Sequence, residues 1–216
     1  MTIIAAYTDG RKAYIAADWA CSYEETDVVF YDRTPKVREF PIFGSETPAL
    51  LGIAGEASIS ARLSGMVLPA LPDDGEPTIE WAESVGQLVT ETIMATTNPP
   101  MMTYEGESSG INGEFLMVVG SRIFVLLDHG AMEPNRQYAA IGSGDDFALG
   151  FLYATTGVIR PTVSPARVLI DCIQATAASV SSCGLDGREP FLQLAPPLIG
   201  ANPFLQKGER DAVHCR

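Results

Sequence analysis

The sequence predicts an α+β protein in which two β-sheets pack face to face and a pair of helices covers each outer side, a four-layer αββα sandwich. Two observations lead to this prediction. The expected elements follow the order strands, two helices, strands, two helices. Several strands are apolar on both faces, so each face needs a covering layer. The 216 residues, 46% hydrophobic, are expected to form one domain over 1–216 with an irregular tail from about 195.

The first group of strands begins with a hairpin. Residues 2–8 are apolar and β-prone, Asp9-Gly10 is a strong turn signal, and residues 12–18 return antiparallel. A three-residue loop would pair Thr2 with Asp18, whereas a two-residue loop would place Asp18 next to the residue that faces Thr2. In either register the side chains of Thr2 and Asp18 lie side by side.

Apolar periodicity and breaker residues predict the remaining elements. Further strands are expected over 36–40, 49–55, 114–119, 122–128, 138–141 and 191–194. Helices are expected over 56–68, over 78–97, from 145 to about 155, and from Pro165 onward behind a Ser164 N-cap. Loops are expected over 21–35 and 101–113.

Composition excludes several classes of function. A net charge of −13 with three lysines argues against nucleic acid and anionic membranes as partners. No apolar run is long enough to span a membrane and the N-terminus lacks the basic region and hydrophobic core of a signal peptide, so we expect a soluble, cytoplasmic protein. No nucleotide or metal motif is present, and no cofactor is expected. The cysteines lack metal-ligand spacing and are expected to be reduced: Cys21, Cys172, Cys183 and Cys215.

Four segments, in order, resemble the proteasome β-subunits and their bacterial relatives of the HslV type, which are N-terminal-nucleophile (Ntn) threonine hydrolases. The segments are Thr2–Ile4 through Ile15–Asp18, Pro35–Val37, Leu51–Ala57 and Tyr138–Gly150. The resemblance covers roughly residues 2–184. It implies the same sandwich fold, cleavage of peptide or unfolded-protein substrates, and assembly into a homo-oligomeric ring. It is also compatible with a separate ATPase unfoldase that delivers substrates to the ring.

The resemblance implies catalytic roles for five residues. Thr2, freed when the preceding methionine is removed, is the nucleophile, and its own α-amine is the base. Lys36 supplies a positive charge that lowers the pKa of that amine, and Asp18 holds the lysine. Gly55 donates its backbone N–H to the oxyanion, and Ser143 forms a hydrogen bond near the amine. Other interpretations are a structural salt bridge for Lys36 and Asp18, a helix-start glycine for Gly55, and a turn or capping residue for Ser143.

Four further positions match residues that border the substrate strand and its first side-chain pocket in the family. They are Cys21, Ser22, Ile53 and Ala57. Small and apolar linings there favour an apolar substrate residue before the cleaved bond.

The chain departs from the proteasome pattern after the last helix. Proteasome β-subunits carry an aspartate and a serine where this chain has Val180 and Cys183, so an orienting hydrogen bond is either missing or replaced by Ser181 or Ser182. HslV-type subunits also lack that aspartate, and like them this chain is expected to have no propeptide before the threonine. An insertion around 104–112 and the tail to Arg216 extend beyond the usual HslV length.

Three functions remain open at this point. The first is a threonine peptidase confined within a ring. The second is an Ntn amidase or transpeptidase on a dedicated substrate, because water or an amine can resolve the same acyl intermediate. The third is a catalytically silent ring or scaffold subunit that keeps Met1 attached.

Overall fold

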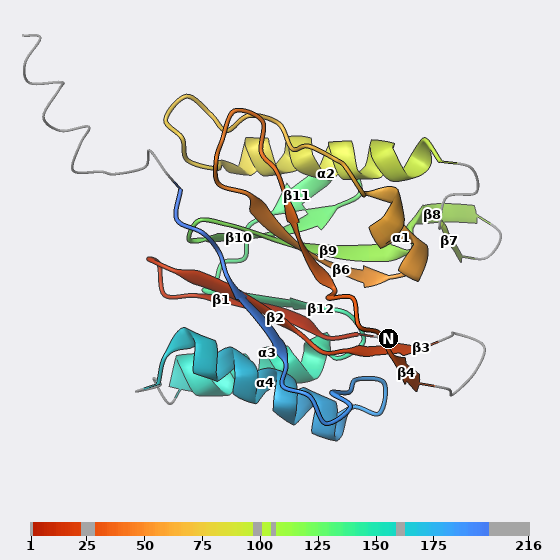
Figure 1. The fold of residues 1–216 in the computed structure, drawn as a ribbon, viewed down its shortest axis with the longest axis vertical. Coiled ribbons are helices and arrows are strands. Elements are labelled where there is room, and N and C mark those ends of the chain that lie inside the picture. Colours follow the sequence, from red (N-terminus) through yellow and green to blue (C-terminus); the bar gives the residue numbers. More distant parts are fainter. Residues whose placement is uncertain (1, 23–28, 97–100, 105–106, 159–162, 199–216) are drawn as a thin grey trace, which may run out of the picture.

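The computed structural model describes residues 2–22, 29–96, 101–104, 107–158 and 163–198, and it confirms the four-layer α+β sandwich (Figure 1). One central layer is an antiparallel sheet in the order β12-β1-β2-β13. Its strands are β1 (Ile4–Thr8), β2 (Ala13–Ala17), β12 (Tyr138–Ile141) and β13 (Phe191–Leu194). The sequence predicted the bounds of the last two strands.

The other central layer is a five-stranded antiparallel sheet in the order β11-β10-β9-β6-β5. Its strands are β5 (Val37–Phe40), β6 (Ala49–Gly55), β9 (Gly113–Val119), β10 (Arg122–Leu127) and β11 (Gly130–Met132). The edge strand β11 was not predicted, because a run of three residues carries no periodicity that distinguishes it from a loop.

Two helices cover the outer face of each sheet (Figure 1). The helices α1 (Ala57–Arg62) and α2 (Ile79–Met94) lie on the five-stranded sheet, and α3 (Asp145–Leu152) and α4 (Pro165–Ser179) lie on the four-stranded one. The predicted N-cap of α4 is present, because Ser164 Oγ accepts a hydrogen bond from the Arg167 N–H at 3.4 Å. Among the described residues no helix is long and apolar enough to cross a membrane.

Three buried apolar layers hold the sandwich together. Ile4 and Ala6 of β1 face the other sheet, whereas Ala5 and the preceding Ile3 face α3 and α4. This alternation makes the strand apolar on both faces, which is why the sequence required a covering layer on each side. Leu116 in β9 packs in the layer between the sheets and is fully buried. The first hairpin is thus an inner element of the fold, and both of its faces are fixed by packing.

Both registers predicted for the first hairpin are wrong. Ile4 pairs with Ala17 and Thr8 with Ala13, so the loop runs from Asp9 to Lys12. The Asp9 carboxylate accepts hydrogen bonds from the N–H groups of Arg11 and Lys12, each at 2.8 Å, and these bonds favour a longer loop than the Asp-Gly signal indicated. As a result Asp18 lies opposite Ile3, the residue that follows Thr2, and not opposite Thr2 itself.

Several other predicted boundaries were also wrong. The predicted loops over 21–35 and 101–113 contain short hairpins: β3 (Ala20–Ser22) with β4 (Val29–Tyr31), and β7 (Met101–Tyr104) with β8 (Glu107–Ile111). The insertion around 104–112 falls largely in the second of these hairpins. The helix predicted over 56–68 is only α1, and the helix predicted from 145 gives way to the π-helical turn η1 (Tyr153–Val158) after α3. Residue 97, the predicted end of α2, and the tail beyond 198 lie outside the described residues.

Candidate active site

A buried ion pair lies at the end of the first hairpin. Lys36 Nζ is 2.6 Å from Asp18 Oδ1, and the exposed fraction is 8% for the lysine side chain and 0% for the aspartate. The same ammonium donates to the backbone carbonyl of Ala20 at 2.5 Å. Two strands provide the pair, because Asp18 directly follows β2 and Lys36 directly precedes β5. The pair therefore links the two sheets at this end of the molecule.

Backbone donors hold the Asp18 carboxylate in place. Oδ1 accepts from the N–H of Ile3 at 3.1 Å, and Oδ2 accepts from the N–H groups of Ala20 at 3.3 Å and Gly184 at 2.9 Å. A charge at zero exposure needs this degree of pairing, because an uncompensated buried carboxylate is very unfavourable. Because Oδ1 binds both Lys36 and the amide of the residue after Thr2, the lysine charge is fixed beside the start of the chain.

The turn between β12 and α3 meets Thr2 from the other side. The N–H of Thr2 donates to Ser143 Oγ at 3.1 Å, and the N–H of Gly144 donates to the Thr2 carbonyl at 3.2 Å. Gly142 has φ +94°, and a Cβ at this position would lie 2.4 Å from the Thr2 carbonyl oxygen. Glycine is therefore needed at this position both for its backbone conformation and for the close approach of Thr2. Thr2 itself is 6% exposed.

Ser182 is the residue that sequence reasoning left undecided. Its Oγ lies 3.0 Å from Ser143 Oγ, and the residue is 8% exposed, whereas Ser181 is exposed to solvent. Cys183 lies directly behind it, with Sγ 4.0 Å from Ser182 Oγ. Burial raises the pKa of the Cys183 thiol to about 11, and the negative charge of Asp18 adds to the shift. The thiol is therefore protonated and neutral at physiological pH.

The N–H of Gly55 is directed toward the edge of β6 that faces Lys36. In β6, the N–H of Ile53 donates to the Lys36 carbonyl at 3.0 Å, and the direction of successive N–H groups alternates along a strand. Gly55 follows by two residues, at a point where β5 has not yet begun. The next N–H, that of Glu56, turns the other way and donates to Asn112 O. An N–H aimed past the end of β5 is suitably placed to bind an oxygen of a ligand.

The residues predicted to border the substrate are in different environments. Ile53 is 8% exposed and Cys21 is half-buried, whereas Ala57 is exposed in the first turn of α1. The backbone of Ser22 pairs with Val29 in the β3–β4 hairpin, and its side chain lies outside the described residues. In Figure 1 this hairpin and α1 lie at the same end of the molecule as the start of β1.

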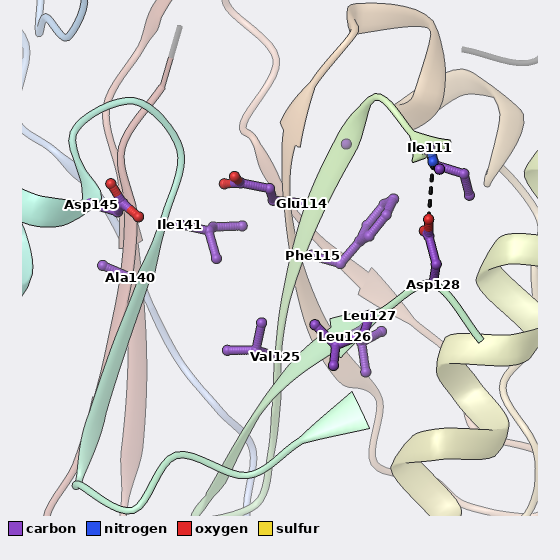
Figure 2. A pocket seen from close by; sticks show the side chains of 12 residues that line it. Ile111, Glu114, Phe115, Val125, Leu126, Leu127, Asp128, Ala140, Ile141 and Asp145 are labelled. Carbon is purple, nitrogen blue, oxygen red and sulfur yellow. Dashed lines mark hydrogen bonds between the residues drawn. The ribbon is translucent and has the colours of Figure 1, made fainter. Parts of the chain in front are cut away.

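A separate cavity of about 400 Å³ opens between the two sheets (Figure 2). Its walls include Phe115, Val125 and Ile141, and neither Thr2 nor the ion pair lines it. Glu114 points across it toward the β12 side, and its Oε2 accepts from the N–H of Gly142 at 2.5 Å. Sequence reasoning gave no signal for this bond, which ties β9 to the turn that carries Ser143.

The arrangement at Thr2 suits nucleophilic chemistry. Within the described part of the chain, no group of three or more His, Cys, Asp or Glu side chains could hold a metal ion. What the site offers is a hydroxyl, a fixed cation and a serine at the Thr2 nitrogen. Such a set can activate a hydroxyl through a neighbouring base once that nitrogen becomes a free amine.

Comparison with known proteins shows which solved structures have a similar fold. No protein-family model matches the sequence, and no curated protein matches it. BPH from Thiobacillus denitrificans, solved in complex with epoxomicin, has a TM-score of 0.66 and 19% identity over 90% of this chain and 100% of its own. HslV from Trypanosoma brucei has a TM-score of 0.60 and 12% identity over 89% of this chain and 98% of its own. Anbu, an ancestral beta-subunit from Yersinia bercovieri, has a TM-score of 0.61 and 15% identity over 98% of this chain and 94% of its own.

These similarities span nearly the whole length of both chains. At 12 to 19% identity they establish the architecture, and the chemistry has to be argued from the site. The chain therefore has the proteasome-like Ntn-hydrolase fold, which it shares with HslV and Anbu.

Proposed function

We propose that this chain is a threonine-type endopeptidase in which Thr2, once Met1 has been removed, cleaves peptide bonds. The observation that carries the proposal is the position of the Thr2 nitrogen. It lies 3.1 Å from Ser143 Oγ, and Lys36 shares Asp18 Oδ1 with the amide of the next residue. A free amine at this point would have a cation beside it and a hydroxyl in contact with it.

The proposed reaction has two stages. Thr2 Oγ1 attacks the substrate carbonyl while its proton passes to the α-amine, and the proton then leaves with the departing peptide amine. Water next hydrolyses the ester formed on Thr2 and regenerates the hydroxyl. An α-amine has an ordinary pKa of about 7.7 to 8, and the positive charge of Lys36 lowers it so that more of the base is free.

Gly55 is the proposed donor to the oxyanion. Its N–H points past the end of β5, and a pre-aligned donor of this kind typically contributes about 2.7 to 4 kcal/mol to lowering the barrier. Position 55 also requires glycine for structural reasons, because φ is +117° and a Cβ would lie 2.5 Å from the carbonyl oxygen of Asn112. Gly55 can therefore be required for its backbone conformation and also donate its N–H to the oxyanion.

We further propose that the chain acts as a homo-oligomeric ring in the cytoplasm, taking peptides or unfolded proteins whose residue before the cut is apolar. The proteasome-like fold supports the ring, and the buried, apolar Ile53 beside Lys36 supports the preference. A separate ATPase unfoldase would be needed for folded substrates, since this chain contains no nucleotide motif.

The decisive experiment combines mass and activity. Intact mass should show that Met1 is absent, and the purified protein should cleave fluorogenic peptides that end in an apolar residue. Thr2→Ala should abolish cleavage, whereas Thr2→Ser, which keeps a hydroxyl and an α-amine, should retain part of it. Because the fold neighbour BPH was solved with epoxomicin, that compound is a suitable inhibitor to test. Undiminished cleavage by the Thr2→Ala protein would overturn the proposal.

The same measurements separate the competing functions. Retained Met1 would deny Thr2 a free amine and would favour the silent ring or scaffold subunit. If the wild-type protein transfers the acyl group to an added amine more readily than to water, mass spectrometry of the products will show the amide. That result would favour the amidase or transpeptidase.

A further inference from the structure

We propose that Ser182 is a positioning residue of the Thr2 site, which holds the Ser143 hydroxyl so that it can serve the Thr2 amine in both of its protonation states. The inference rests on the proposed function, because this amine exists only after Met1 is removed. Val180 and Cys183 stand where proteasome β-subunits carry an aspartate and a serine, so the residue that forms the orienting hydrogen bond was undecided. The inference assigns that hydrogen bond to Ser182.

The first support is the contact geometry. Ser143 Oγ lies between the Thr2 nitrogen at 3.1 Å and Ser182 Oγ at 3.0 Å, which forms a continuous chain of hydrogen bonds. Ser143 Oγ also lies 3.4 Å from the Thr2 carbonyl, a competing acceptor. Ser143 Oγ makes its shortest contact with Ser182, and this contact fixes the hydroxyl proton away from the Thr2 carbonyl. Without Ser182, the longer contact to the carbonyl and the neighbouring Cys183 thiol would remain to orient the hydroxyl, and its lone pairs would be held less firmly toward the nitrogen.

The second support is how firmly the backbone holds Ser182. The N–H of Val180 donates to Thr176 O in the last turn of α4 at 2.8 Å, and the N–H of Cys183 donates back to Val180 O at 3.0 Å. On the other side, Gly184 donates to Asp18 Oδ2 at 2.9 Å and accepts from the N–H of Trp19 at 3.0 Å. Residues 180–184 are thus fixed both to α4 and to the end of the first hairpin, so Ser182 does not have to be ordered when substrate binds.

The third support is the chemistry of a hydroxyl. A serine both donates and accepts, whereas an ionised carboxylate only accepts. When the amine is protonated, it donates to Ser143, and Ser143 donates to Ser182. When the amine is neutral, Ser182 donates to Ser143, and Ser143 donates to the nitrogen lone pair. The chain of bonds can reverse while both contacts of Ser143 are kept, which suits a base that must gain and lose a proton in each turnover.

The charged groups around the Thr2 amine set its pKa, so it matters that residue 182 is a neutral serine and not a carboxylate. Lys36 and Asp18 approach from the hairpin side, Glu114 reaches the turn through the Gly142 N–H, and Asp145 begins α3. The titratable group directly behind Ser182 is the Cys183 thiol, and it is neutral. The charge that reaches this segment is the Asp18 carboxylate, which accepts from the Gly184 N–H and is already paired with Lys36. A further carboxylate introduced at Ser182 would have no such cation beside it, so it would stabilise the protonated amine and make the base weaker at neutral pH.

The test compares Ser182 with its exposed neighbour Ser181 as a matched control. On the apolar fluorogenic peptide we expect Ser182→Ala to lower kcat about tenfold with KM unchanged, the upper end of the range for one lost hydrogen bond between neutral groups. Ser182→Thr, which keeps the hydroxyl, should restore most of the rate, and Ser181→Ala should behave like the wild type. A rate for Ser182→Ala equal to that of Ser181→Ala would overturn the proposal.

A second pair of variants tests the charge argument. Ser182→Asp should move the acid limb of the kcat/KM profile upward by about 1 pH unit, whereas Ser182→Asn, of the same size but neutral, should leave it in place. The pH titration of the Thr2 γ-methyl resonance, in protein labelled at threonine methyl groups, should show the same shift without any turnover. Equal titration of the Asp and Asn proteins would overturn the charge argument.

These readouts separate failure of the inference from failure of the proposed function. If the wild-type protein cleaves peptides and the Ser182 variants match it in rate and titration, only the role of Ser182 is lost. If the wild-type protein has lost Met1 but shows no hydrolysis, the peptidase function fails, and the titration still decides whether Ser182 positions the amine. Retained Met1 overturns both.

Discussion

Two ion pairs of this molecule have almost the same length and very different surroundings. Lys36 and Asp18 lie 2.6 Å apart with side-chain exposures of 8% and 0%, and Arg167 and Asp171 lie 2.8 Å apart on α4 with exposures of 59% and 38%. The buried carboxylate accepts from three backbone N–H groups as well as from the lysine. The exposed pair joins two neighbouring turns of one helix. Distance alone therefore says little about what a pair does.

The difference lies in what happens when a partner is lost. Water replaces the missing partner of an exposed pair, and such i,i+4 pairs contribute about 0.3 to 0.5 kcal/mol. A buried charge without its partner has no such replacement, and breaking a buried pair costs about 3 to 5 kcal/mol. The rigid pair also keeps a positive charge at a fixed place beside Thr2, which an exposed and mobile pair could not do.

The largest effect should come from removing the buried carboxylate. Asp18→Ala leaves Lys36 buried without its counter-ion and leaves the N–H groups of Ile3 and Gly184 without an acceptor. We expect the free energy of unfolding to fall by about 3 to 5 kcal/mol in denaturant titrations. The control is Asp171→Ala, which should cost about 0.5 kcal/mol or less. Equal losses in the two proteins would show that burial does not set the value of the pair.

The next effect separates catalysis from stability at the same pair. In Lys36→Ala the carboxylate keeps its backbone donors, so the protein should stay folded with a smaller loss of stability than in Asp18→Ala. Peptide cleavage should fall by about 100-fold or more, because the amine loses the cation that keeps it deprotonated. Circular dichroism and the peptide assay measure the two effects. Surviving activity would make Lys36 a structural partner of Asp18 only.

Sequence reasoning predicted most of the fold because its strands are buried apolar runs that end at breakers. The runs that became β6, β12 and β13 have the predicted bounds, and residues of each strand pack against the layers on both sides. It failed where side chains that bond to the backbone decide a local structure. The Asp9 carboxylate sets the loop of the first hairpin, and the sequence did not show that it would bind Lys12 rather than close a shorter turn.

For the candidate site, the order of the motifs led to residues that the structure brings together, and their catalytic roles remain proposals. Lys36 reaches Asp18, and Ser143 reaches Thr2. The sequence could not choose between Ser181 and Ser182, because the two adjacent serines lie where α4 ends and helical periodicity no longer assigns a face. The bond from Gly142 to Glu114 joins the turn after β12 to β9 of the other sheet, and no local pattern encodes it.

A smaller effect concerns the thiol next to the buried pair. Burial raises the pKa of Cys183 to about 11, so the folded protein keeps its proton at a pH where the unfolded chain, with a thiol pKa of about 8.5, has lost it. The stability from this thiol is complete below about pH 8.5 and is lost as pH rises through about 11. Unfolding midpoints between these limits should fall less steeply in Cys183→Ala than in the wild type. Parallel slopes would contradict the assignment.

The smallest expected effect concerns salt, which should act on one pair and not on the other. Raising the ionic strength from about 0.01 to 1 M shortens the Debye length from about 30 to 3 Å, which screens exposed charges far more than buried ones. The coupling energy between Arg167 and Asp171, from a double-mutant cycle, should fall from about 0.3 to 0.5 kcal/mol to near zero. The cost of Asp18→Ala, corrected for the general effect of salt on wild-type stability, should stay constant within about 0.5 kcal/mol, because no salt ion reaches a carboxylate at 0% exposure. If that cost fell together with the α4 coupling, solvent would have to reach Asp18. The pair could then not hold a fixed charge beside Thr2.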